Sequence, residues 1–304
     1  MDADADADPE PAAPLPPHAL AIRAGVPDPA DVLASYRAVG RDSRATILDL
    51  LGSEWSFEGR RVLDFGCGSG KVMRHFLREA ATCELWGCDI DARSTDWINA
   101  ALSPPLHAFA NGEAPPLDVP EGRFDLVWSV SVFTHLTDHW AGWIAELHRV
   151  LAPGGLAIIS FLGGAMYEVW TGEEWDEDCV GMAVLDYEQD WERGGPTVFH
   201  SPWWLREHWG RAFEIVQLRE GIAPREHGLV LLRRRPGPPV SAAALERIDP
   251  AAEPREVDAL RHQVRMLQRE SRHLRAQRDA LSLAAARRLD RRVAGRVRRL
   301  RGGR

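Results

Sequence analysis

The sequence predicts an α/β fold built on a mixed β-sheet, and three features indicate it. The glycine-rich turn GCGSG separates an apolar run at 61–65 from a stretch with helical spacing of apolar residues. Further strand candidates recur along the chain at 84–88, 106–110, 124–129, 155–161, 213–219 and 228–234. Helical patterns separate most of them, as in parallel βαβ units, whereas only GIAPREH separates the last two, which should therefore pair as an antiparallel hairpin.

The chain should contain one folded domain with extended ends. Its 304 residues, 45% of them hydrophobic, are enough for a domain of about 200 residues with a full core. Residues 1–29 are rich in Asp, Ala and Pro, and we expect them to be disordered. The domain should span 30–236, followed by a linker at 237–255 and a separate segment at 256–304. No apolar stretch approaches the roughly 18 residues of a membrane-spanning helix, and the acidic N-terminus is unlike a signal peptide, so we expect a cytoplasmic protein.

Charge is unevenly distributed along the chain. The net charge is −8, yet residues 261–304 contain fifteen arginines and only three acidic residues. The acidic remainder argues against nucleic acid as the substrate, whereas the basic end suits a polyanionic partner or an anionic membrane surface. Cysteines at 67, 83, 88 and 179 show neither a paired framework nor a metal-binding spacing, so we expect free thiols. We expect no metal site, because the acidic run at 173–178 is typical of a solvated loop.

Helices are expected between the strands. Asp31 begins a helical pattern that runs to Leu51, with an interruption near Gly40. A second pattern follows the glycine-rich turn and includes Phe76. A third ends before Pro153, which cannot continue a helix, and the glycines after it lead into the strand at 155–161.

Two features point to a ligand site at the ends of the first strands. Glycines let a ligand approach the backbone, and a helix N-terminus offers free N–H groups. The pattern is G-x-G-x-G, with Lys71 where a dinucleotide fingerprint requires its third glycine, so a nicotinamide enzyme is the weaker interpretation. Asp89 ends the second strand, where a carboxylate can bind a ribose diol. An Asp there can also cap a helix, a role that Asp91 suits better.

These residues resemble the class I S-adenosylmethionine-dependent methyltransferases over roughly residues 31–235. The resembling motifs are VLDFGCGSG, GCDID, GRFDLVWSVSVFTHL and ELHRVLAPGGLAIIS, in that order. The resemblance implies a Rossmann-like seven-stranded mixed sheet whose last strand is inserted antiparallel, with S-adenosylmethionine as cofactor. It implies cofactor-binding roles for Asp64, Gly66, Cys67, Gly68, Gly70, Asp89, Ile90, Asn111, Glu113 and Ser129. Of these, Asp89 would bind the ribose, Ile90 the adenine, and Ser129 the sulfonium side.

Methyl transfer to a hydroxyl also needs a base to remove its proton. His135 and His200 are the candidate catalytic residues, although a structural role is an open alternative for each. The segment 163–211 is dense in aromatic residues and should form a substrate lid. The motifs look closest to methyltransferases of bacterial surface-polysaccharide pathways, which implies O-methylation of a glycan or another small hydroxylated acceptor. The alternative is a non-catalytic S-adenosylmethionine-binding scaffold or interaction protein of a glycan assembly machinery.

The segment 256–304 carries two further patterns. Leucines recur every seven residues at 260, 267, 274 and 281, with Val257 and Val264 at the matching a positions, which predicts a C-terminal coiled-coil helix and a homodimer. Ser271 and Arg278 at later a positions weaken the pattern, and a lone helix folding back on the body is the alternative. Residues 284–304 predict a basic amphipathic helix that would bind an anionic inner membrane face. The alternatives are a solvated basic end and a nonspecific contact with nucleic acid.

Overall fold

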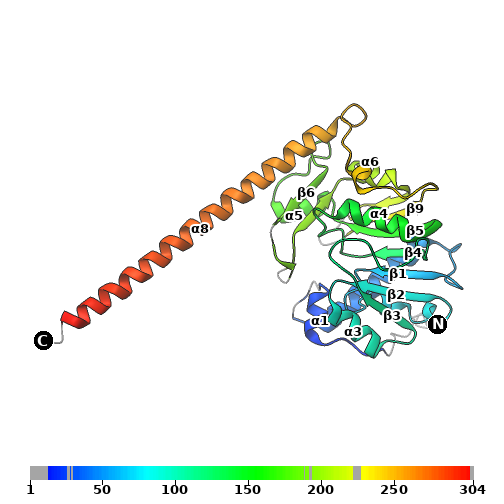
Figure 1. The fold of residues 1–304 in the computed structure, drawn as a ribbon, viewed down its shortest axis with the longest axis horizontal. Coiled ribbons are helices and arrows are strands. Elements are labelled where there is room, and N and C mark those ends of the chain that lie inside the picture. Colours follow the sequence, from blue (N-terminus) through cyan, green and yellow to red (C-terminus); the bar gives the residue numbers. More distant parts are fainter. Residues whose placement is uncertain are drawn as a thin grey trace, which may run out of the picture.

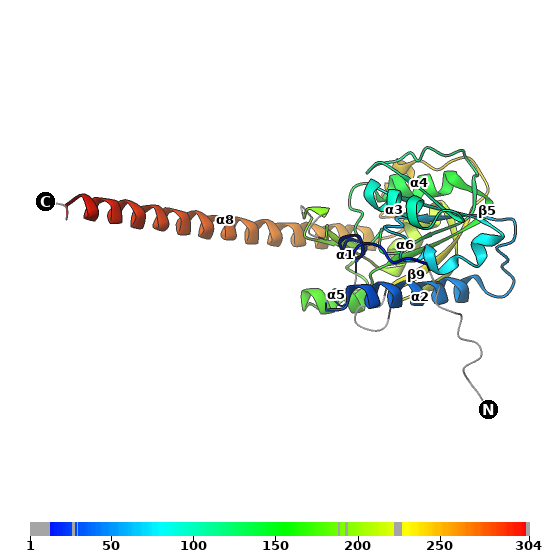
Figure 2. The same ribbon diagram turned by 90° about the horizontal axis from the view of Figure 1, so that it is seen from below.

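A computed structural model shows an α/β domain from which one long helix projects (Figures 1 and 2). The structure describes residues 13–25, 28, 30–187, 189–191, 194–221 and 227–301, and for 283–301 only the course of the backbone. The main sheet has seven strands in the order β3-β2-β1-β4-β5-β9-β8. Their bounds are β1 Arg61–Phe65, β2 Glu84–Asp89, β3 Leu106–Ala110, β4 Phe124–Ser129, β5 Leu151–Phe161, β8 Phe213–Arg219 and β9 Gly228–Arg234.

The predicted mixed sheet is confirmed. Strands β1 to β5 pair in parallel, and β9 pairs antiparallel with both β5 and β8. Strand β5 begins at Leu151, before the predicted 155–161, because Leu151 already pairs with Phe124 across an irregularity in register. Gly154, at a φ of 73°, lies within this irregular start rather than in a separate turn.

Helices cover both faces of the sheet (Figure 2). Helix α2 (Val32–Leu51) contributes Ile47 to the core on one face, where Phe76 and Trp128 stack with their ring centroids 4.6 Å apart. Helix α4 (Trp140–Val150) contributes Trp143 to the core on the other. Helix α3 (Ala92–Ala101) follows β2, and α6 (Pro202–His208) precedes β8. Successive side chains along the strands point alternately into these two cores, as expected of a sheet buried on both sides.

Helix α2 corrects the interruption predicted near Gly40, because it runs unbroken through that residue. Its N-terminus begins as predicted, with the Asp31 carboxylate accepting a hydrogen bond from the backbone N–H of Ala34. Gly40 is needed for close packing rather than for a break. A Cβ atom there would lie 2.0 Å from the carbonyl oxygen of Lys71 and 2.7 Å from the ring of His75.

Gly40→Ala is therefore expected to lower the free energy of unfolding by about 1–3 kcal/mol. The larger value is expected because the nearest atom, the carbonyl oxygen of Lys71, belongs to the backbone and cannot easily move. Gly210→Ala is the matched control, since a Cβ at Gly210 meets nothing within 4 Å. Urea denaturation followed by circular dichroism would measure both variants. Equal midpoints for Gly40→Ala and the unmodified chain would contradict the packing role.

Several segments differ from the prediction. The helix expected after the glycine-rich turn consists of short 3₁₀ turns, Met73–Phe76 and Glu79–Ala81. The described part of residues 1–29 includes helix α1 (His18–Arg23), so this part is not disordered. The predicted lid contains helix α5 (Gly164–Thr171) and a two-stranded sheet of β6 (Met182–Leu185) and β7 (Thr197–His200). The predicted linker contains helix α7 (Ala242–Glu246), whose Leu245 is buried in the core.

Helix α8 (Arg255–Arg301) is one continuous helix, and both views show it extending away from the domain (Figures 1 and 2). The basic amphipathic pattern of 284–304 falls on side chains outside the described part of the chain. Among the described helices, none is both long and apolar enough to cross a membrane. The four cysteines are free thiols, as predicted.

Candidate active site

An open cleft of about 1690 Å³ lies at the carboxyl ends of β1, β2 and β4. Because parallel strands bring their carboxyl ends to one edge, this is where ligands bind in open α/β sheets. Most of the predicted site residues line it: Asp64, Gly66, Cys67, Gly68, Asp89, Ile90, Asn111, Glu113 and His135. The cleft lining does not include Gly70, Ser129 or His200. The structure thus brings together the glycine-rich turn, the end of β2 and one of the two histidines.

The glycine-rich turn brings bare backbone to the cleft. Gly66 has a φ of 76°, and a Cβ there would lie 2.1 Å from Cγ2 of Val132. Gly68 has a φ of 51°, and its N–H donates to Oδ2 of Asp89 at 2.7 Å. Only glycine adopts these backbone conformations without strain, and at Gly66 a side chain would also collide with a neighbour. The backbone geometry of the turn therefore requires glycine at these positions. The same lack of side chains is what a ligand would need in order to reach the backbone.

Asp89 is held by two backbone N–H groups. Oδ2 accepts from Gly68, and Oδ1 accepts from Asp91 at 2.9 Å. Burial raises the pKa of Asp89 above its ordinary value, while these two hydrogen bonds oppose the rise. Each carboxylate oxygen has a further lone pair, so both can also accept from a diol. Asp91 precedes α3 as predicted, but its carboxylate accepts from the Ser94 hydroxyl at 2.8 Å rather than from a backbone N–H of that helix.

Asp64 is almost fully buried at the end of β1 beside the cleft. Burial raises its pKa to about 7. Its Oδ2 has no hydrogen-bond partner within the described residues. A buried oxygen without a partner costs free energy unless a ligand or water satisfies it, so Asp64 is suited to a ligand with a donor group.

Residues 13–25 pack over the glycine-rich turn, which was not predicted from the sequence. The ammonium of Lys71 donates to the carbonyl oxygens of Ala24 and Gly25 at 2.5 and 2.9 Å. The guanidinium of Arg74 donates to the carbonyl oxygens of Ala13 and Pro14 at 2.6 and 3.0 Å. Burial lowers the pKa of Lys71 to about 8. Residues 22–25 consequently line the cleft beside Gly68.

His135 lies in the same cleft, and one hydrogen bond fixes the proton on its ring. Its Nδ1 is 2.7 Å from the carbonyl oxygen of Pro196. A carbonyl can only accept, so Nδ1 carries the proton and the neutral ring has its lone pair on Nε2. Burial lowers the pKa of His135, which favours this neutral form. Such a ring is suited to accept a proton at Nε2.

Further polar residues near His135 were missed in the sequence. Ser131 has a φ of 61°, its N–H donates to the Ser160 hydroxyl at 2.7 Å, and its own hydroxyl is 3.4 Å from Nδ1 of His227. Burial lowers the pKa of His227 to about 4. The apolar part of this end of the cleft is formed by Leu162, Met166, Trp170 and Trp191. A positive φ at a serine could not be read from the sequence, and His227 follows a segment that carries no motif.

His200 has no contact with the cleft. It is fully buried, with its ring centroid 5.1 Å from that of Trp204 and 5.7 Å from that of Trp209. Burial lowers its pKa to about 3, so the ring stays neutral. The side chain of Ser129 is also fully buried, and Gly70 packs against Ile98 and Leu102. None of these three residues is among those that line the cleft, so the structure does not bring their predicted roles to it.

Comparison with known proteins finds similarity to methyltransferases. The family described as methyltransferase domain matches residues 62–155. A 2-methyl-6-phytyl-1,4-hydroquinone methyltransferase of Synechocystis is 34% identical, over 34% of this chain and 32% of the relative. An uncharacterized methyltransferase of Mycobacterium is 33% identical, over 45% of this chain and 51% of the relative. The chain thus spans about a third to a half of the length of these curated relatives.

Among solved structures, magnesium protoporphyrin IX methyltransferase from Synechocystis, with bound SAH, is 15% identical and has a TM-score of 0.49. That likeness covers 71% of this chain and 93% of the other. The family match confirms the methyltransferase resemblance drawn from the four motifs, whereas the resemblance to surface-polysaccharide enzymes stays a prediction. Residues 62–155, which contain the glycine-rich turn, Asp89 and His135, are similar to the methyltransferase domain family. They belong to a seven-stranded sheet whose last strand, β9, is inserted antiparallel, as the resemblance implied.

Proposed function

We propose that this chain is an S-adenosylmethionine-dependent methyltransferase that methylates an oxygen of a hydroxylated acceptor. The observation that carries the proposal is that the glycine-rich turn, Asp89 and His135 all line one cleft. The family match and the methyltransferase relatives support the reaction class.

The residues of the cleft fit S-adenosylmethionine. Gly66 and Gly68 allow the ligand to contact the backbone, and Asp89 offers two oxygens to a ribose diol. Ile90 is 41% exposed although it is a large apolar residue, and its side chain suits packing against adenine. Asp64 offers its buried oxygen to a donor at the methionine end. When bound, the cofactor supplies an electrophilic methyl group, and the chain has to orient the acceptor and exclude water.

His135 is the proposed general base. Its Nε2 would accept the proton of the acceptor hydroxyl as that oxygen becomes methylated, and the Pro196 carbonyl would hold the resulting imidazolium by its Nδ1 proton. His200 remains a candidate only in a conformation that differs from the one described, because here it is enclosed by tryptophans.

The acceptor should carry a hydroxyl on a partly apolar body. Ser131, His135 and His227 provide polar groups, while Leu162 and Trp170 provide apolar surface in the same cleft. A sugar ring has an apolar face that packs on aromatic side chains, and we propose a glycan as the first choice. A phenol with an apolar substituent also fits, and relatives act on a phytyl hydroquinone and on tocopherol according to their names.

Transfer of radiolabelled methyl groups from S-adenosylmethionine into a cell extract tests the proposed function. The extract is then separated into glycan, lipid, protein and nucleic-acid fractions, and the Asp89→Ala variant serves as the control for labelling by other enzymes. Label in glycans or in small hydroxylated lipids supports the proposal and identifies the acceptor class. Label in protein or nucleic acid alone would refute the acceptor class, and no label in any fraction would favour the non-catalytic scaffold.

A further inference from the structure

Helix α8 exposes a stripe of large apolar side chains. The heptad stripe consists of its a and d positions: Val257, Leu260, Val264, Leu267, Ser271, Leu274, Arg278 and Leu281. Leu260, Val264 and Leu274 are each about half exposed, and Leu281 is 72% exposed. Helices in proteins gain most of their stability by packing an apolar face against a partner. The stripe therefore lacks, within the described chain, the packing that its sequence pattern calls for.

The domain leaves most of the stripe exposed, because α8 contacts it mainly through a neighbouring face. Tyr187 of the domain lies beside the stripe, next to Leu267, Ser271 and Leu274. Ala259 is buried, the Gln263 side chain accepts from the backbone N–H of Val184, and Glu270 accepts from that of Tyr187. The Tyr167 hydroxyl of α5 lies 3.2 Å from Nε2 of His262 and 3.9 Å from the sulfur of Met266. At about 100° per residue, the side of the helix that carries Ala259, Gln263 and Glu270 is centred about 80° from the stripe, with Gln263 and Glu270 at the g positions along one edge of it. Folding back on the body and pairing through the stripe are therefore compatible.

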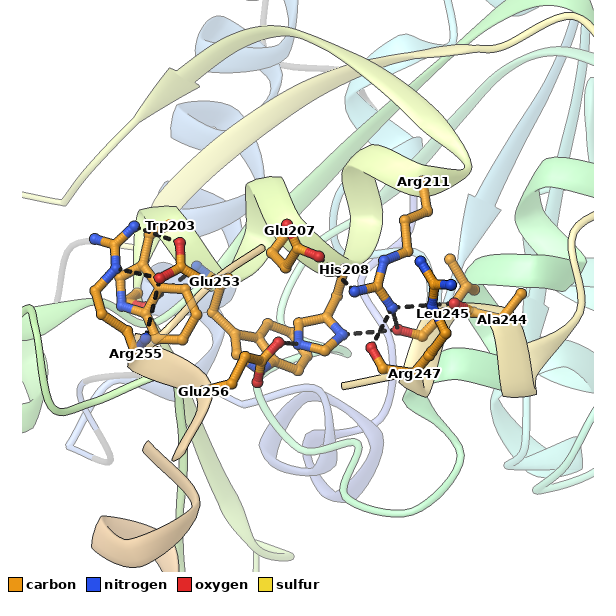
Figure 3. A network of polar contacts seen from close by, with 12 residues as sticks. Trp203, Glu207, His208, Arg211, Ala244, Leu245, Arg247, Glu253, Arg255 and Glu256 are labelled. Atoms are coloured by element: carbon orange, nitrogen blue, oxygen red, sulfur yellow. Dashed lines mark hydrogen bonds and ion pairs between the residues drawn. The ribbon is translucent and has the colours of Figure 1, made fainter. Parts of the chain in front are cut away.

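The root of α8 is fixed to the domain by a polar network (Figure 3). Nε2 of His208 lies 3.0 Å from Oε1 of Glu256, close enough for an ion pair although poorly aligned for a hydrogen bond, and both residues are buried. On its other side, Nδ1 of His208 is 2.7 Å from the carbonyl oxygen of Leu245. The guanidinium of Arg255 lies 4.8 Å from the ring centre of Trp203. The helix thus leaves the domain in a set direction with its stripe outward.

We propose that a second copy of this chain docks on the heptad stripe and forms a parallel two-stranded coiled coil. Two observations favour a second copy. The stripe has the a and d spacing of a self-complementary pair, with leucine at every d position from 260 to 281. A hollow of about 380 Å³ lies beside its middle, between Tyr187 and the helix, where a side chain of a facing helix fits.

The mass of the intact chain in solution tests the proposal. Sedimentation equilibrium at micromolar concentration is expected to give twice the chain mass of 33.9 kDa. The double variant Leu274→Asp and Leu281→Asp should be monomeric, because it places charges on the stripe at positions that the domain leaves exposed. The matched control is Ala276→Asp with Ala280→Asp, which adds the same charges to exposed positions of the same helix away from the stripe and should stay dimeric.

Circular dichroism of each variant confirms that the domain remains folded. A monomeric intact chain would overturn the proposal, and this is the result expected if the stripe binds a partner of different sequence. A dimeric mass that persists in the Leu274→Asp and Leu281→Asp double variant would also overturn it. Ser271→Cys tests the parallel orientation. Because residue 271 is at an a position, the two introduced cysteines of a parallel pair should form a disulfide between copies under oxidation. The unmodified chain should not be crosslinked. Absence of a crosslink in the variant would contradict the parallel pair.

Discussion

Asp89→Ala is expected to weaken the binding of S-adenosylmethionine by about 100-fold. The substitution removes both oxygens that the proposal assigns to the ribose diol, and hydrogen bonds to charged groups contribute about 1.5–3 kcal/mol each. It also removes the acceptor that holds the N–H of Gly68 at 2.7 Å, so the glycine-rich turn loses a restraint. Isothermal titration calorimetry of the variant and of the unmodified chain measures the effect.

Glu84→Ala is the matched control for this prediction. Glu84 lies at the opposite end of the same strand, its side chain is 55% exposed, and it pairs with Arg123. This variant should bind the cofactor as the unmodified chain does. Gly68→Arg should abolish binding, because its side chain would enter the cleft at a backbone conformation suited to glycine. Unchanged affinity in both Asp89→Ala and Gly68→Arg would remove the cofactor assignment.

His135→Gln is expected to lower kcat by about 10²- to 10⁴-fold, the usual contribution of a general base. Glutamine can still donate to the Pro196 carbonyl, but it has no basic nitrogen in place of Nε2. Cofactor affinity should not change, because the cofactor-binding roles fall on other residues. The measurement is the steady-state rate with the acceptor class identified by labelling.

The pH profile distinguishes a base from a structural residue. Burial lowers the pKa of His135 from its ordinary value, so this base should be neutral at neutral pH. The rate should fall in acid as the ring becomes protonated, and this acid limb should disappear in His135→Gln. His107→Gln is the control, since His107 of β3 packs beside Trp86 of β2 and does not line the cleft. A rate or pH profile that His135→Gln leaves intact would refute the assignment.

Much of the sheet could be predicted because its strands are short apolar runs with turn residues on both sides. Strands β1, β3 and β4 have the predicted bounds, and the short connection GIAPREH correctly predicted the antiparallel β9. The meeting of the glycine-rich turn with Asp89 was also predictable. Both follow parallel strands, so the topology alone brings them to one edge of the sheet.

The other features depend on contacts between distant segments, which periodicity does not encode. Residues 13–25 look disordered by composition, but Lys71 and Arg74 bind their backbone carbonyls. The role of Gly40 depends on the backbone carbonyl of Lys71, which belongs to a different segment of the chain. In the same way, heptad spacing identified the stripe on α8 but not the separate face that holds the helix to the domain.

Titration of the intact chain with S-adenosylmethionine, and in parallel with NAD, tests the central claim most directly. The glycine-rich turn and Asp89 are compatible in outline with either ligand, and within this motif the third glycine position, occupied by Lys71, argues against the dinucleotide. We predict one molecule of S-adenosylmethionine bound per chain with micromolar affinity, and no heat of binding from NAD. Binding of NAD without binding of S-adenosylmethionine would contradict the proposed function.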